Sequence, residues 1–489
     1  MKTSPCLMLA LLPALLTSVV QASVPGPMQR ELQRAGIPTS AVSIELREAG
    51  ATGALLQHRS RAPMNPASTM KLLTTYAALE MLGPTFTWKT PAYLAGELRQ
   101  GRLLGDLHIQ GSGDPKITYE ALQSFLHHLR SQGLTHIQGD LVLDRSHFAL
   151  PRHDAAAFDN EPLKAYNVGP DALLFNFKTI RFVFDKDPTQ DLPRVRAEPH
   201  PAGLRIDSQL VPAAGSCNNW RAHLEAGFDS TAERANVRFR GGFPLACEEQ
   251  SWWVSLLDHA PLFAQSFRSM WLEMGGSISG GWREGKRAAD AKPFAQLESP
   301  PLAEIIRDIN KRSNNVMARQ LFLTLAAPDP AQVATLPAAQ ARLASWLRSK
   351  NLHFREFAVE NGAGLSRSDR ITAEHLAQVL QHAWASTVMP EFLASLPVSA
   401  TDGTLQHRML GRPAAGRAHL KTGSLDEVRA LAGYLLDERG RRYVLVAFVN
   451  HPRAAAAQPA LDALVDWVVR RAAGGGARRA ANLENSVDR

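Results

Sequence analysis

Hydrophobic and polar residues are arranged in different patterns along the chain, and each pattern predicts a different kind of structure. Near the N-terminus, two short runs typical of β-strands, Ala41 to Leu46 and Ala54 to His58, are separated by a Gly-containing turn. A helical pattern follows from Ser68 to Leu82 and ends at Gly83-Pro84. Because this helix is apolar on most of its sides, we expect it to lie inside a large domain.

The middle and the end of the chain have different patterns. From about residue 86 to residue 278, short β-like runs alternate with Gly and Pro turns, which predicts one or two β-rich modules. From Pro301 the pattern is helical again, and the chain then closes with three strand signals and an amphipathic helix, Pro459 to Arg471. The expected helices are Leu302 to Leu325, Pro337 to Lys350, Thr372 to Trp384 and Pro390 to Leu396, and the expected strands are Ala418 to Lys421, Val428 to Leu436 and Tyr443 to Asn450.

Strands at both ends with helices between them indicate an α+β fold in which the N-terminal and C-terminal strands share one sheet. The β-rich middle is then an insertion into that domain. We expect the split domain to comprise residues 23–88 and 265–473, and the β-rich inserted domain or domains to comprise residues 89–264. The Gly/Ala/Arg-rich tail, 474–489, is expected to be disordered.

The composition of the 489 residues predicts a folded chain and excludes several classes of function. With 45% apolar residues there is enough material for large packed cores, which excludes a disordered or fibrous protein. The formal net charge of +8 is mild for this length, and no basic-aromatic pattern indicates nucleic-acid binding. The sequence contains no H-E-x-x-H, G-x-S-x-G, C-x-x-C or Gly-rich phosphate loop, so nothing implies a metal or a cofactor.

The first 22 residues have the features of a secretory signal peptide. A short basic start, Met1-Lys2, precedes an apolar run from Cys6 to Val20, and cleavage is expected after Ala22. A retained membrane helix is the weaker alternative, because the run is short for a span and contains Pro13. The sequence therefore predicts export.

Two cysteines remain after such a cleavage, Cys217 and Cys247. Because an exported protein meets an oxidising compartment, we expect them to form a disulfide. Two separate buried thiols are the alternative.

Three short motifs could carry chemistry. The first is Ser68-Thr69-Met70-Lys71, in which a hydroxyl at a helix start lies one turn from a lysine. Burial disfavours the charged form of a lysine, so Lys71 could be neutral and deprotonate Ser68. The ordinary alternative is an N-cap serine followed by an unremarkable lysine.

The other two motifs are Ser313-Asn314-Asn315 and Lys421-Thr422-Gly423-Ser424. The second motif places three polar residues inside a helical stretch. Ser and Asn are poor helix-interior residues, so these three could instead form the wall of a cleft. The alternative is a helix start capped by Ser313. A strand end such as the third motif can offer a backbone N–H, hydroxyls and a cation to a carbonyl and a carboxylate. Its glycine would permit close approach of another backbone. The alternative is a strand end with turn residues.

The combination decides between these interpretations. The three motifs occur in this order along the chain, the first at a helix start, the second in a segment between helices and the third in a strand. This set of motifs is typical of class A β-lactamases and penicillin-binding proteins. Over nearly its whole length after residue 22, the chain resembles the low-molecular-mass class C penicillin-binding proteins, which are D-alanyl-D-alanine carboxypeptidase/endopeptidases. The stretch between Ser68 and Ser313, far too long for a compact β-lactamase, is a mark of that family. Further similar stretches are Gly111 to Pro115, Asn361 to Arg367 and Asp402 to Leu405, with Asn361 and Ala363 where the family usually has Asp and Ser.

The resemblance implies a β-lactamase/transpeptidase-like domain, an antiparallel sheet flanked by helices, and a serine mechanism. Ser68 would be the acylated nucleophile and Lys71 its general base. Ser313 and Lys421 would relay the proton to the leaving D-alanine, and Asn315 would hold the peptide.

The same resemblance implies how the substrate is bound. The backbone N–H groups of Ser68 and Ser424 would form the oxyanion hole. Thr422, beside Gly423, and Ser424 would bind the terminal carboxylate. Arg367 would bind a carboxylate of the stem peptide, although a solvated loop arginine is an equal alternative.

The resemblance also implies partners and location. The substrates would be peptidoglycan peptides, β-lactams would be covalent inhibitors, and the protein would be periplasmic. Two alternatives are a β-lactamase, disfavoured by the size of the insertion, and a non-catalytic cell-wall binding or scaffold protein, which has no need of both lysines. The oligomeric state and the balance of carboxypeptidase and endopeptidase activity stay open.

Overall fold

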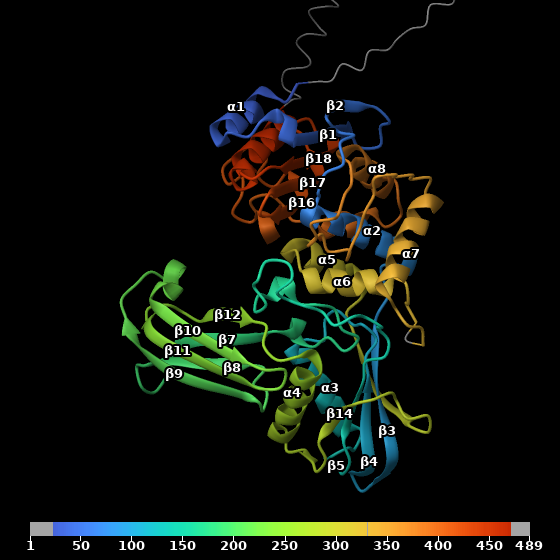
Figure 1. Cartoon of the computed structure of the whole chain (residues 1–489), viewed down its shortest axis with the longest axis vertical. Coiled ribbons are helices and arrows are strands. Elements are labelled where there is room, and N and C mark those ends of the chain that lie inside the picture. Colours follow the sequence, from blue (N-terminus) through green and yellow to red (C-terminus); the bar gives the residue numbers. More distant parts are fainter. Residues whose placement is uncertain (1–22, 330, 471–489) are drawn as a thin grey trace, which may run out of the picture.

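The computed structural model describes residues 23–329 and 331–470 (Figure 1). The expected signal peptide, 1–22, and the expected disordered tail, 474–489, lie outside these residues. In the described part of the chain, no helix combines the length and the hydropathy needed to cross a membrane. The α+β class is confirmed, with several sheets and with helices packed against them.

One domain is built on a five-stranded antiparallel sheet in the order β16-β17-β18-β1-β2. Strand β1 pairs with β18, with Val42 opposite Val449, so the two ends of the chain share a sheet as the pattern predicted. Figure 1 shows these blue and red strands side by side. The strands are β1 (Val42–Glu48), β2 (Ala54–His58), β16 (Ala418–Leu425), β17 (Val428–Leu436) and β18 (Arg442–Asn450).

Helices cover both faces of this sheet. Along β17, Ala430, Ala432 and Tyr434 face one hydrophobic cluster, while Leu431 and Leu435 face another, so the strand is apolar on both sides. The first cluster contains α2 (Met70–Leu82), α5 (Leu302–Arg312), α6 (Asn315–Thr324), α7 (Leu336–Ser349), α8 (Ala373–Trp384) and α9 (Met389–Ser395). The second contains α1 (Gly26–Ala35) and the closing helix, 458–470.

The inserted part contains a seven-stranded sheet and a small sandwich, joined by one hydrophobic core. The larger sheet comprises β3 (Lys89–Arg99), β4 (Arg102–Gln110), β5 (His136–Ile137), β6 (Leu141–Asp144), β13 (Ser277–Ile278), β14 (Trp282–Glu284) and β15 (Lys292–Glu298). The two three-stranded sheets comprise β7 (Ile180–Lys186), β8 (Pro193–Glu198) and β12 (Gln250–Val254), and β9 (Leu204–Ala213), β10 (Leu224–Ser230) and β11 (Ala235–Pro244). Helices α3 (Tyr119–Ser131) and α4 (His259–Glu273) pack into the same core.

Two elements, α4 and β15, bear on the expected boundary between residues 264 and 265. That boundary would cut α4, whose Phe263, Phe267 and Trp271 belong to the core of the insertion. Strand β15 pairs with β3, the first strand of the insertion. We therefore propose that the insertion comprises residues 89–298 and that the other domain resumes at α5.

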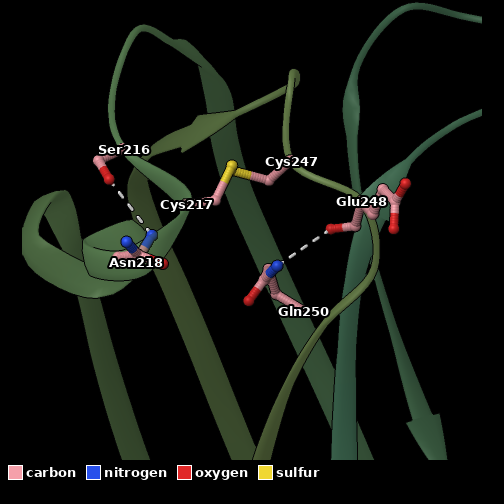
Figure 2. Close-up of a disulfide and its surroundings, with 6 residues drawn as sticks. All are labelled: Ser216, Cys217, Asn218, Cys247, Glu248 and Gln250. Atoms are coloured by element: carbon pink, nitrogen blue, oxygen red, sulfur yellow. Dashed lines mark hydrogen bonds between the residues drawn. A yellow bond between two sulfur atoms is a disulfide. The ribbon is translucent and has the colours of Figure 1, made fainter. Parts of the chain in front are cut away.

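A disulfide closes one end of the sandwich. Cys217 begins a short 3₁₀ helix, Cys217–His223, and Cys247 follows β11; their Cα atoms are 5.4 Å apart (Figure 2). This is the pairing expected for an exported chain. The aromatic core nearby includes Phe184, which packs edge-on against Phe239 at 5.0 Å.

We predict that replacing both cysteines, Cys217→Ser and Cys247→Ser, lowers the free energy of unfolding of the insertion by ~3–4 kcal/mol. The reason is that the bond closes a loop with a sequence separation of 30 residues and so restricts the unfolded chain. Chemical denaturation followed by tryptophan fluorescence measures this loss. The reduced wild-type chain is the control and should match the variant; a variant as stable as the oxidised wild type would contradict the prediction.

Candidate active site

Ser68 lies in a tight turn at the start of a buried helix. A 3₁₀ turn, Ala67–Thr69, leads directly into α2, so the hydroxyl is at the helix start as expected. Ala67 has the left-handed φ of 45°, and its N–H donates to Asn65 Oδ1 at 2.9 Å, which holds the turn. The serine side chain is thereby fixed one turn before Lys71.

Lys71 is fully buried, and its amine contacts three oxygen atoms from three segments. Its Nζ lies 3.1 Å from Ser68 Oγ, 2.7 Å from Asn315 Oδ1 and 2.5 Å from Ala363 O. The sequence motif therefore places a hydroxyl and an amine in direct contact.

The surroundings of Lys71 favour its neutral form. Burial is the main reason that its pKa is well below the ordinary value, and the nearby cations Lys421 and Arg319 lower the pKa further. The carboxylate of Asp369 opposes this effect. A lysine with a lowered pKa can accept a proton near neutral pH.

The segment around Ser313 corrects the expectation of one helix from Leu302 to Leu325. The chain forms two helices, because Ser313 adopts the left-handed φ of 55° at the end of α5. The next helix is capped by Asn314, whose Oδ1 accepts from Met317 N–H at 3.1 Å. The cap is therefore Asn314 and not Ser313.

The third motif brings a second amine to the site from the edge of the sheet. Lys421 is fully buried, and its Nζ donates to Ser313 Oγ at 2.8 Å and to Thr422 O at 2.7 Å. Burial lowers the pKa of Lys421 to about 7. A Cβ on Gly423 would lie 2.8 Å from Pro66 O, so only glycine lets this strand pass so close to the turn that carries the first serine.

A cavity of about 520 Å³ opens in front of these groups. From the motifs, Ser68, Ser313, Asn315 and Ser424 line it. The insertion contributes Phe158, Asp159 and Tyr166. The hydroxyl of Thr422 donates to Thr404 Oγ1 at 2.8 Å, beside this cavity wall.

Arg367 lies at the rim and contacts residues of the cavity wall. Its guanidinium stacks on the ring of Phe158 at 4.7 Å and donates to the backbone oxygen of that residue at 3.2 Å. It also lies 3.6 Å from an Asp426 carboxylate oxygen, and 61% of its side chain stays exposed. The structure therefore brings Arg367 near the other candidates but shows no contact between it and Ser68 or Lys71.

One contribution to the site, from Tyr166, has no signal in the sequence, and a second comes from the stretch Asn361 to Arg367 that the family resemblance singled out. Tyr166 O, in the short 3₁₀ helix Ala165–Asn167 of the insertion, accepts from Asn315 Nδ2 at 3.0 Å. Asn361 closes the loop that presents the Ala363 carbonyl, since its Oδ1 accepts from Ala363 N–H at 3.0 Å and its Nδ2 donates to Leu365 O at 2.9 Å. The amide thus supplies both an acceptor and a donor.

No metal centre accompanies this geometry in residues 23–329 and 331–470, since no three His, Cys, Asp or Glu side chains gather there in a suitable group.

Comparison with known families agrees with this geometry. The family model described as "D-Ala-D-Ala carboxypeptidase 3 (S13) family" matches residues 27–471. The chain belongs to this family. It is a serine-type D-Ala-D-Ala carboxypeptidase of the penicillin-binding class, and the resemblance of its motifs is confirmed.

Relatives of this carboxypeptidase cover most of its length. D-alanyl-D-alanine carboxypeptidase DacB of Haemophilus influenzae is 25% identical over 396 residues, 79% of this chain and 80% of the relative. D-alanyl-D-alanine carboxypeptidase of Actinomadura sp. strain R39 is 28% identical over 395 residues, 77% of this chain and 71% of the relative. The crystal structure of penicillin binding protein 4 from H. influenzae has a TM-score of 0.72 and 21% identity, and the match covers 91% of this chain and 99% of that one. This last likeness confirms the fold.

We predict different effects for two neighbouring asparagines. Asn314→Ala removes a helix cap and should cost about 1 kcal/mol of stability while leaving acylation by a fluorescent penicillin close to wild type. Asn315→Ala removes the amide that holds the Lys71 amine and should slow acylation about 100-fold. Thermal unfolding and gel-based labelling measure the two effects; equal losses of acylation in both variants would contradict this division of roles.

Proposed function

We propose that this carboxypeptidase cleaves the terminal D-alanine of peptidoglycan stem peptides, and the D-centred bonds of cross-links, through an acyl-Ser68 intermediate. The observation that carries the proposal is the 3.1 Å contact between the buried Lys71 amine and Ser68 Oγ, at a serine that lines a cavity. A hydroxyl next to a neutral amine is an activated nucleophile.

The acceptors around Lys71 suit the role of a base. A neutral amine has two N–H donors and one lone pair. Asn315 Oδ1 and Ala363 O take the two donors, which leaves the lone pair for the Ser68 hydroxyl. Ser68 then attacks the carbonyl carbon while its proton passes to Lys71.

The second amine–hydroxyl pair suits departure of the leaving group. Ser313 Oγ and Lys421 Nζ lie 2.8 Å apart. They pass a proton to the amine of the departing D-alanine as the C–N bond breaks. Water then adds to the Ser68 ester, the ester bond breaks, and the serine recovers its proton. The N–H groups of Ser68 and Ser424 stabilise the oxyanion in both steps.

The third motif suits the end of the substrate. Thr422 and Ser424 bind the terminal carboxylate beside Gly423, and Lys421 supplies positive charge when it is protonated. A β-lactam presents a carboxylate and a reactive carbonyl in a similar arrangement, so it acylates Ser68 and is released slowly. A solved structure of H. influenzae penicillin binding protein 4, at 21% identity and a TM-score of 0.68, is complexed with a β-lactam.

The proposed location follows from the sequence. Residues 1–22 direct export and are removed after Ala22, and the enzyme acts in the periplasm. The wall peptides that the mechanism requires are found there.

We predict that Ser68→Ala abolishes labelling by a fluorescent penicillin and slows release of D-alanine from a pentapeptide by at least about 1,000-fold. Mass spectrometry of the labelled wild type should locate the adduct on the peptide that contains Ser68. Ser131→Ala, at an exposed hydroxyl at the end of α3, is the control and should behave as wild type. A label that survives Ser68→Ala would overturn the proposed function.

We predict that Arg367→Gln raises KM for a pentapeptide with a free stem carboxylate about tenfold, with little change in kcat, because a charge-assisted hydrogen bond is lost. The same peptide with that carboxylate amidated should be equally well cleaved by both enzymes. An unchanged KM for the free carboxylate would show that Arg367 only stacks on Phe158.

A further inference from the structure

Two buried charged side chains lie near Lys71, and the mechanism above uses neither. The first is Arg319 on α6, one helical turn after Asn315 and hence on the same face of the helix. Only 7% of this arginine is exposed. Its Nη1 donates to Val168 O at 2.7 Å, and its Nε has no hydrogen-bond partner among the described residues.

The second is Asp369, which is fully buried. Its Oδ1 accepts from Glu360 N–H at 2.8 Å, and its own N–H donates to Ser366 Oγ at 3.0 Å. These bonds anchor the loop whose Ala363 carbonyl contacts the Lys71 amine. The other carboxylate oxygen, Oδ2, has no hydrogen-bond partner within the described ranges.

Neither side chain forms an ion pair in the part of the chain that the structure describes. Burial lowers the pKa of Arg319 to about 10, and the charge of the Glu360 carboxylate opposes this effect. A charge in a buried site acts over a longer distance than one in water. Arg319 lowers the pKa of Lys71 and Asp369 raises it, while Lys421 is the other cation that lowers it. Burial raises the pKa of Asp369 itself to about 6, and the charge of Glu360 contributes in the same direction.

We propose that Arg319 and Asp369 are positioning residues that act through Lys71: the cation on the helix that carries Asn315 and the anion that anchors the Ala363 loop set the charge of this amine in the resting enzyme with opposite signs. This inference rests on the proposed function, because it assumes that neutral Lys71 is the base for Ser68. The positive charge of Arg319 favours the neutral form of the Lys71 amine. The negative charge of Asp369, which anchors the Ala363 loop, limits that effect. Neither group touches the reacting atoms.

Opposite charges predict opposite changes in the pH profile. The test measures the second-order rate constant for acylation by a fluorescent penicillin between pH 5 and pH 10. Arg319→Gln removes a cation, so Lys71 holds its proton more tightly and the acid limb should move to higher pH by about one unit. Asp369→Asn removes an anion without changing the shape of the side chain, so the acid limb should move to lower pH.

Controls separate this effect from damage to the fold. Arg348→Gln makes the same substitution at an exposed position on α7 and should leave the limb unchanged. The double variant Arg319→Gln/Asp369→Asn should return the limb toward the wild-type position, a result that loss of structure would not give. Thermal unfolding identifies any variant that does not fold, and if one single variant fails, the direction of the shift in the other single variant decides the result.

The outcomes distinguish the inference from the proposed function. The roles of Arg319 and Asp369 are overturned if the acid limb of the pH profile is unchanged in either folded variant, or if it moves in the same direction in both variants. In these cases the wild type is still acylated on Ser68, so the proposed function stands. A wild-type chain that is not acylated on Ser68 at any pH overturns the proposed function instead.

Discussion

Two lysine amines buried in one site are the constraint on which the rest of this structure depends. Transfer of an ammonium group from water to a protein interior is costly, so Lys71 and Lys421 need hydrogen-bond acceptors and must give up their charge easily. Their acceptors in the described structure are hydroxyl, amide and carbonyl oxygens rather than carboxylates. Neutral acceptors satisfy the N–H groups without fixing the positive charge, which leaves an amine able to act as a base.

These acceptors come from segments that are far apart in the sequence, so the site forms only when the whole chain is folded. The edge strand β16 passes close to the Ser68 turn because Gly423 has no side chain. The inserted part is also involved, since the Tyr166 backbone oxygen accepts a hydrogen bond from Asn315 Nδ2 and thereby orients the amide whose oxygen contacts Lys71. The insertion is therefore a wall of the site rather than a separate appendage.

The sequence predicted the features that depend on local pattern. The shared sheet, the buried helix and the three motifs follow from apolar periodicity and from short combinations of polar residues. The prediction of one continuous helix from Leu302 to Leu325 was wrong. The helical spacing of apolar residues continues on both sides of the polar segment, so the spacing does not reveal that the helix ends there. Tyr166, Arg319 and Asp369 could not be found, because their importance comes only from which side chains the fold places beside them.

The break in that helix has a physical reason in the site. In a continuous α-helix, residues two positions apart point to different sides, so Ser313 and Asn315 could not both face the cavity. The left-handed turn at Ser313 ends α5 and starts α6 at Asn315, and the hydroxyl then meets Lys421 while the amide meets Lys71. A non-glycine residue in this conformation costs on the order of 1 kcal/mol. Ala67, directly before Ser68, adopts a left-handed conformation as well, so two of the backbone turns that hold the site carry this cost.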